Sequence, residues 1–215
     1  CRHGGRRTRI RCRGTHFTHG TPARARARRR HFDAEGIGSE RRDPGRRHSG
    51  RRIRQADPLL AVNALTDRSR LRIGHDRLQF RIKSKEPGHV YVFLSGTDKR
   101  HFYLLFPNEI DRDNRIAANT EVTLPRKSWA ITAGGPPGTN HIVTVVSRQP
   151  LDLGAVGLRA AGDEIPEFDL AQAEGLWAAR QPGRSPFLGS VVCKGEAPCD
   201  TGYGASLLEV EEFGP

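Results

Sequence analysis

The chain holds residue types that hydrolases use, but not in the arrangement that hydrolysis requires. A hydrolase elbow holds its nucleophile in a Gly-x-Ser-x-Gly turn between a strand and a helix, and no serine of this chain stands in that frame. Four histidines of the apolar part of the chain each stand singly within or beside strand-like runs, as surface or hydrogen-bonded strand residues do: His75, His89, His101 and His141. The sequence therefore predicts no catalytic residues and a protein that is not an enzyme.

Two polar loops have the composition of ligand-binding loops. Residues 111–114 (DRDN) begin like a calcium loop, but the following Gly is missing and Val122 occupies the place of the bidentate Glu. Residues 133–141 (AGGPPGTNH) could offer backbone N–H groups to an anion, yet the two prolines and the missing Gly-Lys-Ser/Thr ending favour a wide turn between strands. The candidate binding residues are Asn108, Asp113, Asn114, Asn140 and His141, and neither a metal nor a cofactor is predicted. For Asn108 and Asn114 the alternative role is to cap turns through hydrogen bonds from side chain to backbone.

A third candidate is the cysteine pair Cys193 and Cys199. Their loop, CKGEAPC, contains Gly195 and Pro198 and could close into a small disulfide ring, which implies an oxidising compartment. Two unpaired thiols of a cytosolic protein are the alternative. A zinc site needs about four ligands at characteristic spacing, and no second Cys or His pair flanks this loop. We predict the disulfide and an extracytoplasmic location in the periplasm or envelope, with the cytoplasm as the alternative.

Short alternating apolar runs, separated by turn residues, position these loops and predict an all-β fold. Leu78, Phe80 and Ile82 alternate with polar residues, and the turn Glu86-Pro87-Gly88 leads into the apolar run HVYVFL. The spacing predicts an antiparallel β-sandwich of about seven short strands. Trp129 and Trp177 are expected to fill the core with their indole N–H groups satisfied locally. The strands are predicted at residues 78–82, 89–94, 102–106, 121–124, 129–132, 141–146 and 205–210.

One segment has a helical pattern instead. Residues 166–180 (PEFDLAQAEGLWAAR) place Pro166 in the first turn, acidic residues early and Arg180 late, which suits the helix dipole. The apolar residues fall roughly on one helical face, although Gly175 weakens the helix. We predict one appended amphipathic helix. The folded domain is then expected at 58–215, with its core at 71–148 and the helix and final strand at 166–213.

The first part of the chain has a different character. Residues 1–55 contain eighteen Arg, no Lys and four acids, a formal charge of +14, whereas the rest carries −2 of the total of +12. Because the first Leu is Leu59 and large apolar residues are few before it, residues 1–57 are predicted to be a disordered Arg-rich tail. The run ARARARRRH at 23–31 would bind polyanions such as DNA or RNA without sequence preference. A nucleic-acid partner is expected only if the tail belongs to the native protein.

The origin of the tail is open because the chain has no Met and begins with Cys1. These features are typical of a fragment, a processed form or a translation that enters the true frame late. Arg without Lys is what a GC-rich gene gives in the wrong frame, and a genuine basic tail is the alternative. No run of about 18 apolar residues occurs, so no membrane span is predicted.

Residues 71–147 resemble a bacterial domain of unknown function family, DUF 4384. The resemblance is carried by five pieces in order: RIGHDRLQFRIKS (72–84), GHVYVFL (88–94), LLFPN (104–108), DRDNRIAANTEVTLP (111–125) and AGGPPGTNHIVTVVS (133–147). The chain departs from the family pattern at His75, at His89 and at Asn119, where Gly is typical and Asn also tolerates a left-handed backbone.

The resemblance implies a non-catalytic module that senses or binds a protein or small ligand. Family members are similar to modules of bacterial signalling or cell-envelope proteins, including serine/threonine kinases, and many are extracytoplasmic. The competing hypothesis is a polyanion binder in which the tail supplies the affinity and the β-domain is a scaffold.

Overall fold

The computed structural model describes residues 8–10, 48–49, 51–52, 57–99, 101–156, 158, 165–169, 175, 188–193, 195 and 199–214. Within these residues the fold is all-β with several sheets, plus one turn of 3-10 helix, η1 (Gly154–Val156). Most of the predicted disordered tail, residues 1–57, lies outside the described residues. Within it, the structure describes three short strands at 8–10, 48–49 and 51–52, together with Asp57. The rest of the strands confirm the all-β prediction.

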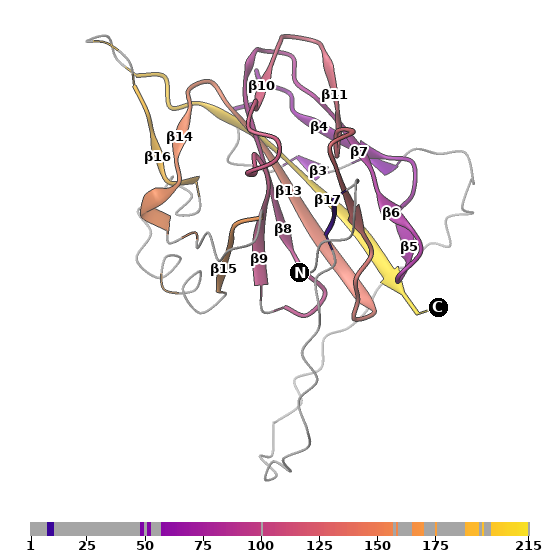
Figure 1. The fold of residues 1–215 in the computed structure, drawn as a ribbon. Helices are drawn as coiled ribbons and strands as arrows, with labels where there is room; N and C mark the ends of the chain where they lie inside the picture. Colours follow the sequence, from indigo (N-terminus) through magenta and orange to yellow (C-terminus); the bar gives the residue numbers. More distant parts are fainter. Residues whose placement is uncertain are drawn as a thin grey trace, which may run out of the picture. The chain divides into compact units, whose positions relative to one another are not determined.

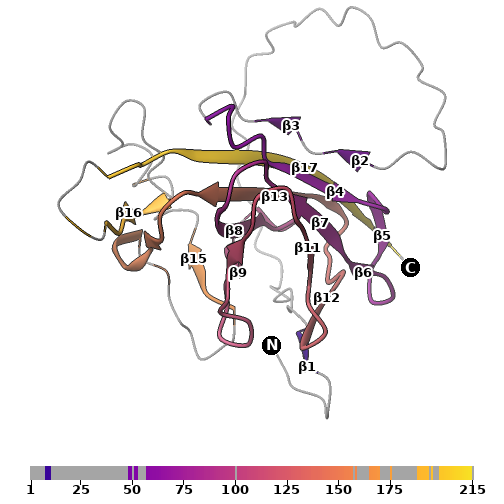
Figure 2. The ribbon, with the colours of Figure 1, turned by 90° about the horizontal axis from the view of Figure 1, so that it is seen from above.

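The strands are β1 (Thr8–Ile10), β2 (His48–Ser49), β3 (Arg51–Arg52), β4 (Asn63–Thr66), β5 (Arg70–Arg72), β6 (Arg77–Leu78), β7 (Phe80–Lys83), β8 (Gly88–Ser95), β9 (His101–Phe106), β10 (Arg115–Ile116), β11 (Glu121–Leu124), β12 (Trp129–Thr132), β13 (Gly138–Ser147), β14 (Leu151–Asp152), β15 (Glu167–Asp169), β16 (Ser190–Val191) and β17 (Tyr203–Phe213). All seven predicted strands are present, as β6 with β7, β8, β9, β11, β12, β13 and β17 (Figures 1 and 2). The other strands, β1 to β5, β10 and β14 to β16, were not predicted.

The large sheet has the order β15-β9-β8-β13-β17-β3, with β10 also paired to β8 and β5 to β17. Its centre is β13, which pairs antiparallel with β17 over residues 138–147 and with β8 over residues 141–147. The β-branched run of β13, HIVTVV, suits a strand that is hydrogen-bonded on both sides. Only the β5–β17 pairing within this sheet is parallel among the described strands.

Two flanking sheets, β11-β7-β4-β2 and β1-β12-β6, form the second part of the fold. β6 and β7 are nearly continuous, with Gln79 between them, and β11 and β12 run antiparallel beside them. The register moves from Leu124 opposite Phe80 to Ile131 opposite Leu78. Residues 125–130 therefore do not pair with β6 or β7, and the pairing resumes at Ile131. We call residues 125–130 the excursion.

The main core lies between the large sheet and the flanking sheets. Residues from both contribute to one buried cluster, among them Phe80 and Ile82 of β7, Leu124 of β11 and Ile142 of β13, each no more than 1% exposed. The alternation in β7 explains this, since Phe80 and Ile82 are buried while Lys83 is exposed. Alternate residues of half-buried strands point to opposite faces, so the apolar set faces the core.

A second apolar cluster covers the other face of the large sheet. It holds Tyr91, Phe93, Leu104, Val145 and Ala205, and the Phe93 and Phe102 rings stack with centroids 5.7 Å apart. The partly buried residues that pack on it from beyond the large sheet are Leu151, Leu153, Leu158 and Leu188. We call residues 149–156, 158 and 188–193 the cover. Its strands β14 and β16 lie on one side of the large sheet, with β4 and β7 on the other (Figure 1).

The first turn of the predicted helix at 166–180 is wrong. Residues 167–169 form β15, which pairs antiparallel with β9, and Pro166 accepts a hydrogen bond from the Leu104 N–H. The open edge of β9 offers backbone partners that outweigh the local helical pattern. The remainder of the predicted helix, apart from Gly175, lies outside the described residues, as does Trp177. Trp129 is buried as expected, and Asn119 has a left-handed backbone with φ of 59°.

The position of β17 generates a stability prediction. Leu208 is buried in the main core, whereas its neighbour Leu207 is only partly buried. We expect Leu208→Ala to lower the free energy of unfolding by about 2–5 kcal/mol, because it leaves a cavity in the core. The matched variant Leu207→Ala should cost about 1 kcal/mol. Urea unfolding followed by circular dichroism measures both, and equal effects would contradict a β17 that completes the core.

Candidate binding edge

The carboxylate of Asp111 joins three parts of the chain. Its side chain is 8% exposed and accepts hydrogen bonds from the Trp129 indole N–H at 3.1 Å and from the Arg126 guanidinium. The same Arg126 donates to the Asp113 carbonyl oxygen at 2.9 Å and lies over the Phe106 ring, 5.2 Å from its centroid. A buried carboxylate is stable only when it is paired and hydrogen-bonded, and Asp111 meets both conditions.

Asn108 fixes the loop that carries Asp111. Its Oδ1 accepts from the backbone N–H groups of Ile110 and Asp111 at 3.0 and 2.9 Å, and its Nδ2 donates to the Leu105 carbonyl at 2.8 Å. Because Asn108 is itself buried, this is the turn-capping role predicted as the alternative for this residue. Asn108 and Asp111 therefore form one hydrogen-bonded cluster with Arg126 and Trp129. We call this cluster the Asp111 node.

The Asp111 node determines where β12 begins. Arg126 and Trp129 both belong to the excursion at 125–130, so their bonds to Asp111 attach the excursion to the end of β9. The backbone N–H of Trp129 donates to the Arg126 carbonyl at 3.2 Å, which closes a turn. β12 thus leaves a fixed point before it pairs with β6.

We call the side of β11 and β12 that faces away from β7 and β6 the binding edge. β11 pairs with β7 alone among the described strands. β12 pairs with β6 at Ile131 and Thr132, and on its other side takes β1 as a parallel neighbour, with Arg9 opposite Ala130 (Figure 2). An edge strand exposes unpaired N–H and C=O groups that can pair with an added strand.

The side chains along the binding edge are partly apolar. Val122 of β11 and Ile131 of β12 are partly buried and pack against the main core, as does Ile110 beside the Asp111 node. β11 begins with Glu121 and is followed by Pro125, and charged residues and proline at an edge oppose uncontrolled strand pairing. The arrangement could bind an extended polypeptide whose alternate side chains cover Val122 and Ile131.

The five candidate binding residues do not converge on one site. Asn114 lies at the Gly88 end of β8: its Nδ2 donates to the Val90 carbonyl at 3.1 Å, and its Oδ1 lies 3.3 Å from His89 Nδ1. His141 pairs in register with Ser95, at the opposite end of β8, and its Nε2 lies 3.8 Å from the Glu209 carboxylate. The candidates thus divide between two ends of the large sheet.

Asp113 is exposed and bonds to its neighbour. Its carboxylate accepts from Arg115 Nε at 3.0 Å, and the Arg115 side chain and backbone N–H hold the pKa of Asp113 below its ordinary value. In the described part of the chain, no group of three or more His, Cys, Asp or Glu residues could hold a metal ion. The helices described there include none that is long and apolar enough to cross a membrane.

The Gly-Pro loop uses its backbone donor within the protein. Gly135, with φ of 70°, donates its N–H to Glu212 Oε2 at 2.6 Å, and Asn140 Nδ2 donates to Oε1 of the same carboxylate at 2.8 Å. Glu212 therefore occupies the place that an anion would take at Gly135. The bonds connect this loop to the end of β17.

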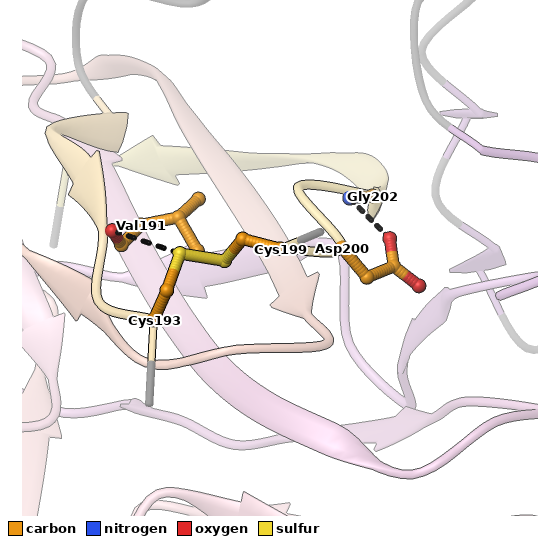
Figure 3. Close-up of a disulfide and its surroundings, with 5 residues drawn as sticks. All are labelled: Val191, Cys193, Cys199, Asp200 and Gly202. Atoms are coloured by element: carbon orange, nitrogen blue, oxygen red, sulfur yellow. Dashed lines mark hydrogen bonds between the residues drawn. A yellow bond between two sulfur atoms is a disulfide. The ribbon is translucent and has the colours of Figure 1, made fainter. Parts of the chain in front are cut away.

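The predicted disulfide joins Cys193 and Cys199, with their Cα atoms 5.7 Å apart (Figure 3). Beside it, Arg148 donates to Asp57 at 3.0 Å and lies 3.2 Å from the Asp200 carboxylate. The pKa of Asp57 is lowered first by the Leu59 N–H and then by Arg148. The pKa of the Tyr203 phenol, at the start of β17, is raised by burial.

Residues 70–150 match the family model described as Domain of unknown function (DUF4384). This match confirms the resemblance predicted over residues 71–147. It includes the Asp111 node and the binding edge, and it ends before β14 and β17. No curated protein and no solved structure matches the chain significantly.

The Asp111 node can be tested by a pair of nearly isosteric changes. Asp111→Asn removes the charge that pairs with Arg126 and should lower the free energy of unfolding by about 1–3 kcal/mol. Asp113→Asn changes an exposed carboxylate two residues away and should leave the urea midpoint unchanged. Urea denaturation with tryptophan fluorescence measures both midpoints. Equal midpoints for the two variants would show that Asp111 does not anchor the excursion.

Proposed function

We propose that this chain is a non-catalytic binding module of a bacterial signalling or cell-envelope protein, built on a β-sandwich. Its ligand is an extended segment of a partner protein, which adds as a strand to the binding edge. The disulfide supports an oxidising compartment, so the proposal includes an extracytoplasmic location. The observation that carries the proposal is the pairing of β1 with β12 beside β11, which pairs with β7 alone among the described strands.

The physical basis is that main-chain hydrogen bonds do not depend on side-chain identity. An edge that accepts Thr8–Ile10 as a neighbour offers the same N–H and C=O groups to an extended partner segment. Specificity then comes from alternate side chains of the added strand. Because Val122 and Ile131 are partly exposed along this edge, the preferred partner carries apolar residues at alternate positions.

A second candidate function is polyanion binding through the tail, favoured by the eighteen Arg in residues 1–55. Arginine clusters release counterions from nucleic acid, so binding of this kind weakens steeply with salt. The candidate places the affinity in the tail and leaves the β-domain as a scaffold.

The strand-addition proposal predicts which peptides bind and where. Random linear peptides displayed on phage are selected on the immobilised 215-residue chain, and the enriched peptides are synthesised. We expect alternating apolar residues in them, and slower hydrogen exchange within Glu121–Leu124 when they bind, because the β11 amides that face away from β7 gain partners, whereas β12 already pairs with β1. Peptides that bind but leave exchange within Glu121–Leu124 unchanged would contradict the binding edge.

A variant pair at Ala130 sharpens this test. Ala130 is not paired with β6, so Ala130→Pro removes a backbone donor without breaking the β6–β12 pairs. We expect the affinity for a selected peptide to fall about tenfold or more, from the lost hydrogen bond. Ala130→Thr keeps the donor and should keep the affinity, as measured by isothermal titration calorimetry. Equal affinities for the two variants would place the peptide elsewhere.

Removal of residues 1–55 separates the two candidate functions. Under strand addition, the shortened chain keeps its fold and its peptide binding, and loss of β1 frees the β12 edge. Under polyanion binding, the same deletion abolishes binding of duplex DNA. In the full chain, the logarithm of the association constant for DNA should fall linearly with the logarithm of the salt concentration, with a slope of about −0.9 for each phosphate contact. Fluorescence anisotropy with labelled peptide and labelled DNA measures both, and loss of peptide binding with the tail would overturn strand addition.

A further inference from the structure

Among the described residues, few backbone bonds attach the cover over the second apolar cluster. β14 and β16 pair over two residues each, Leu151 with Val191 and Asp152 with Ser190. The Leu151 N–H donates to the Tyr91 hydroxyl at 2.8 Å, and the Val192 N–H donates to the Pro150 carbonyl at 2.8 Å. Short strands with so few partners open locally at low cost in free energy.

The disulfide fastens this cover to the large sheet. Cys193 follows β16, Cys199 precedes β17, and the bond between them bypasses the intervening segment (Figure 3). β17 is itself fixed by its ladder with β13. The covalent link therefore keeps the end of the cover close to the start of a central strand, which restricts the opening of the cover.

An ion-paired arginine strengthens the same corner. Arg148 follows β13 directly, and its guanidinium lies between Asp57 and Asp200, the residue after Cys199. The backbone N–H of Arg148 donates to the Gly202 carbonyl at 3.2 Å, and the backbone N–H of Gly202 donates to Asp200 Oδ1 at 2.8 Å. In the described part of the chain, the disulfide thus joins the cover, which has few bonds of its own, to the segment before β17 that Arg148 holds in place.

The disulfide is also open to solvent. Cys193 is exposed and Cys199 is partly buried, so a small thiol can reach the sulfur of Cys193. Beneath the cover lie Tyr91, Phe93 and Val145, each no more than 4% exposed. Loosening of the cover would therefore bring an aromatic sheet face into contact with water.

We propose that the Cys193–Cys199 disulfide is a redox-sensitive clamp on the cover. A dithiol reductant attacks one sulfur through its thiolate and forms a mixed disulfide, which its second thiolate resolves. Two electrons and two protons pass to Cys193 and Cys199, which become thiols, and the reductant leaves as a disulfide. The cover then opens over the face of Tyr91 and Phe93, while the β8–β13–β17 ladder stays closed. This inference does not depend on the binding edge.

Hydrogen exchange with mass spectrometry tests the clamp on the full chain, before and after dithiothreitol. In the reduced protein, amides of residues 151–152 and 190–192 should exchange about tenfold faster or more, because the opening of the cover is no longer restrained. Amides of residues 141–147 should exchange as in the oxidised protein. Fluorescence of the dye ANS should rise on reduction, because it reports the exposed apolar face.

The double variant Cys193→Ser/Cys199→Ser is the matched control, since it keeps Cys1 and Cys12. It should exchange like the reduced protein and should not respond to dithiothreitol. Two results would overturn the proposal. If exchange in the cover is the same in both redox states, the disulfide does not hold the cover. If residues 141–147 also lose protection on reduction, the disulfide stabilises the whole fold and is no local clamp.

Discussion

Strand β13 is hydrogen-bonded on both sides and apolar on both faces, and the rest of the structure follows from that constraint. Ile142 and Val146 face the main core, whereas Val145 belongs to the second cluster on the opposite face. A strand of this kind must be covered twice, because each exposed apolar face would cost about 25 cal/mol for every Å² left in water. The flanking sheets supply one cover, and residues after 149 supply the other.

The two covers are built by different means. The flanking sheets are held by ladders such as β4–β7 and β7–β11, so regular backbone pairing maintains them. The second cover has one ribbon of two residue pairs in its described part, and a covalent bond supplements it. A layer with few hydrogen bonds depends more on a cross-link, because restricting its open states is then the main way to keep it closed. This difference in attachment is the physical basis of the proposed clamp.

The sequence predicted the strands well because their alternation is local, as in Leu78 to Ile82, and because turn residues separate them. It failed at Glu167–Asp169, where the edge of β9 overrode a local helical pattern. It also missed the Asp111 node, since Arg126 and Trp129 are distant in sequence and no spacing rule relates them to Asp111. The candidate loop residues carried a correct signal for capping, as Asn108 shows, but the sequence held no information on which loops meet in space.

The carboxylate of the Asp111–Arg126 pair is buried and the guanidinium is partly exposed. Removing such a carboxylate from water is costly, so the net contribution of the pair to stability is often small. What it does supply is position, because removal of one partner leaves an uncompensated charge and the excursion cannot shift without breaking the pair. The binding edge begins at that fixed point, and both lie within the residues that match the family, 70–150. The disulfide lies beyond them, as does the cover from Leu151 onward. The proposed strand addition therefore uses the part of the fold that matches the family model, and the proposed redox control uses residues that follow it.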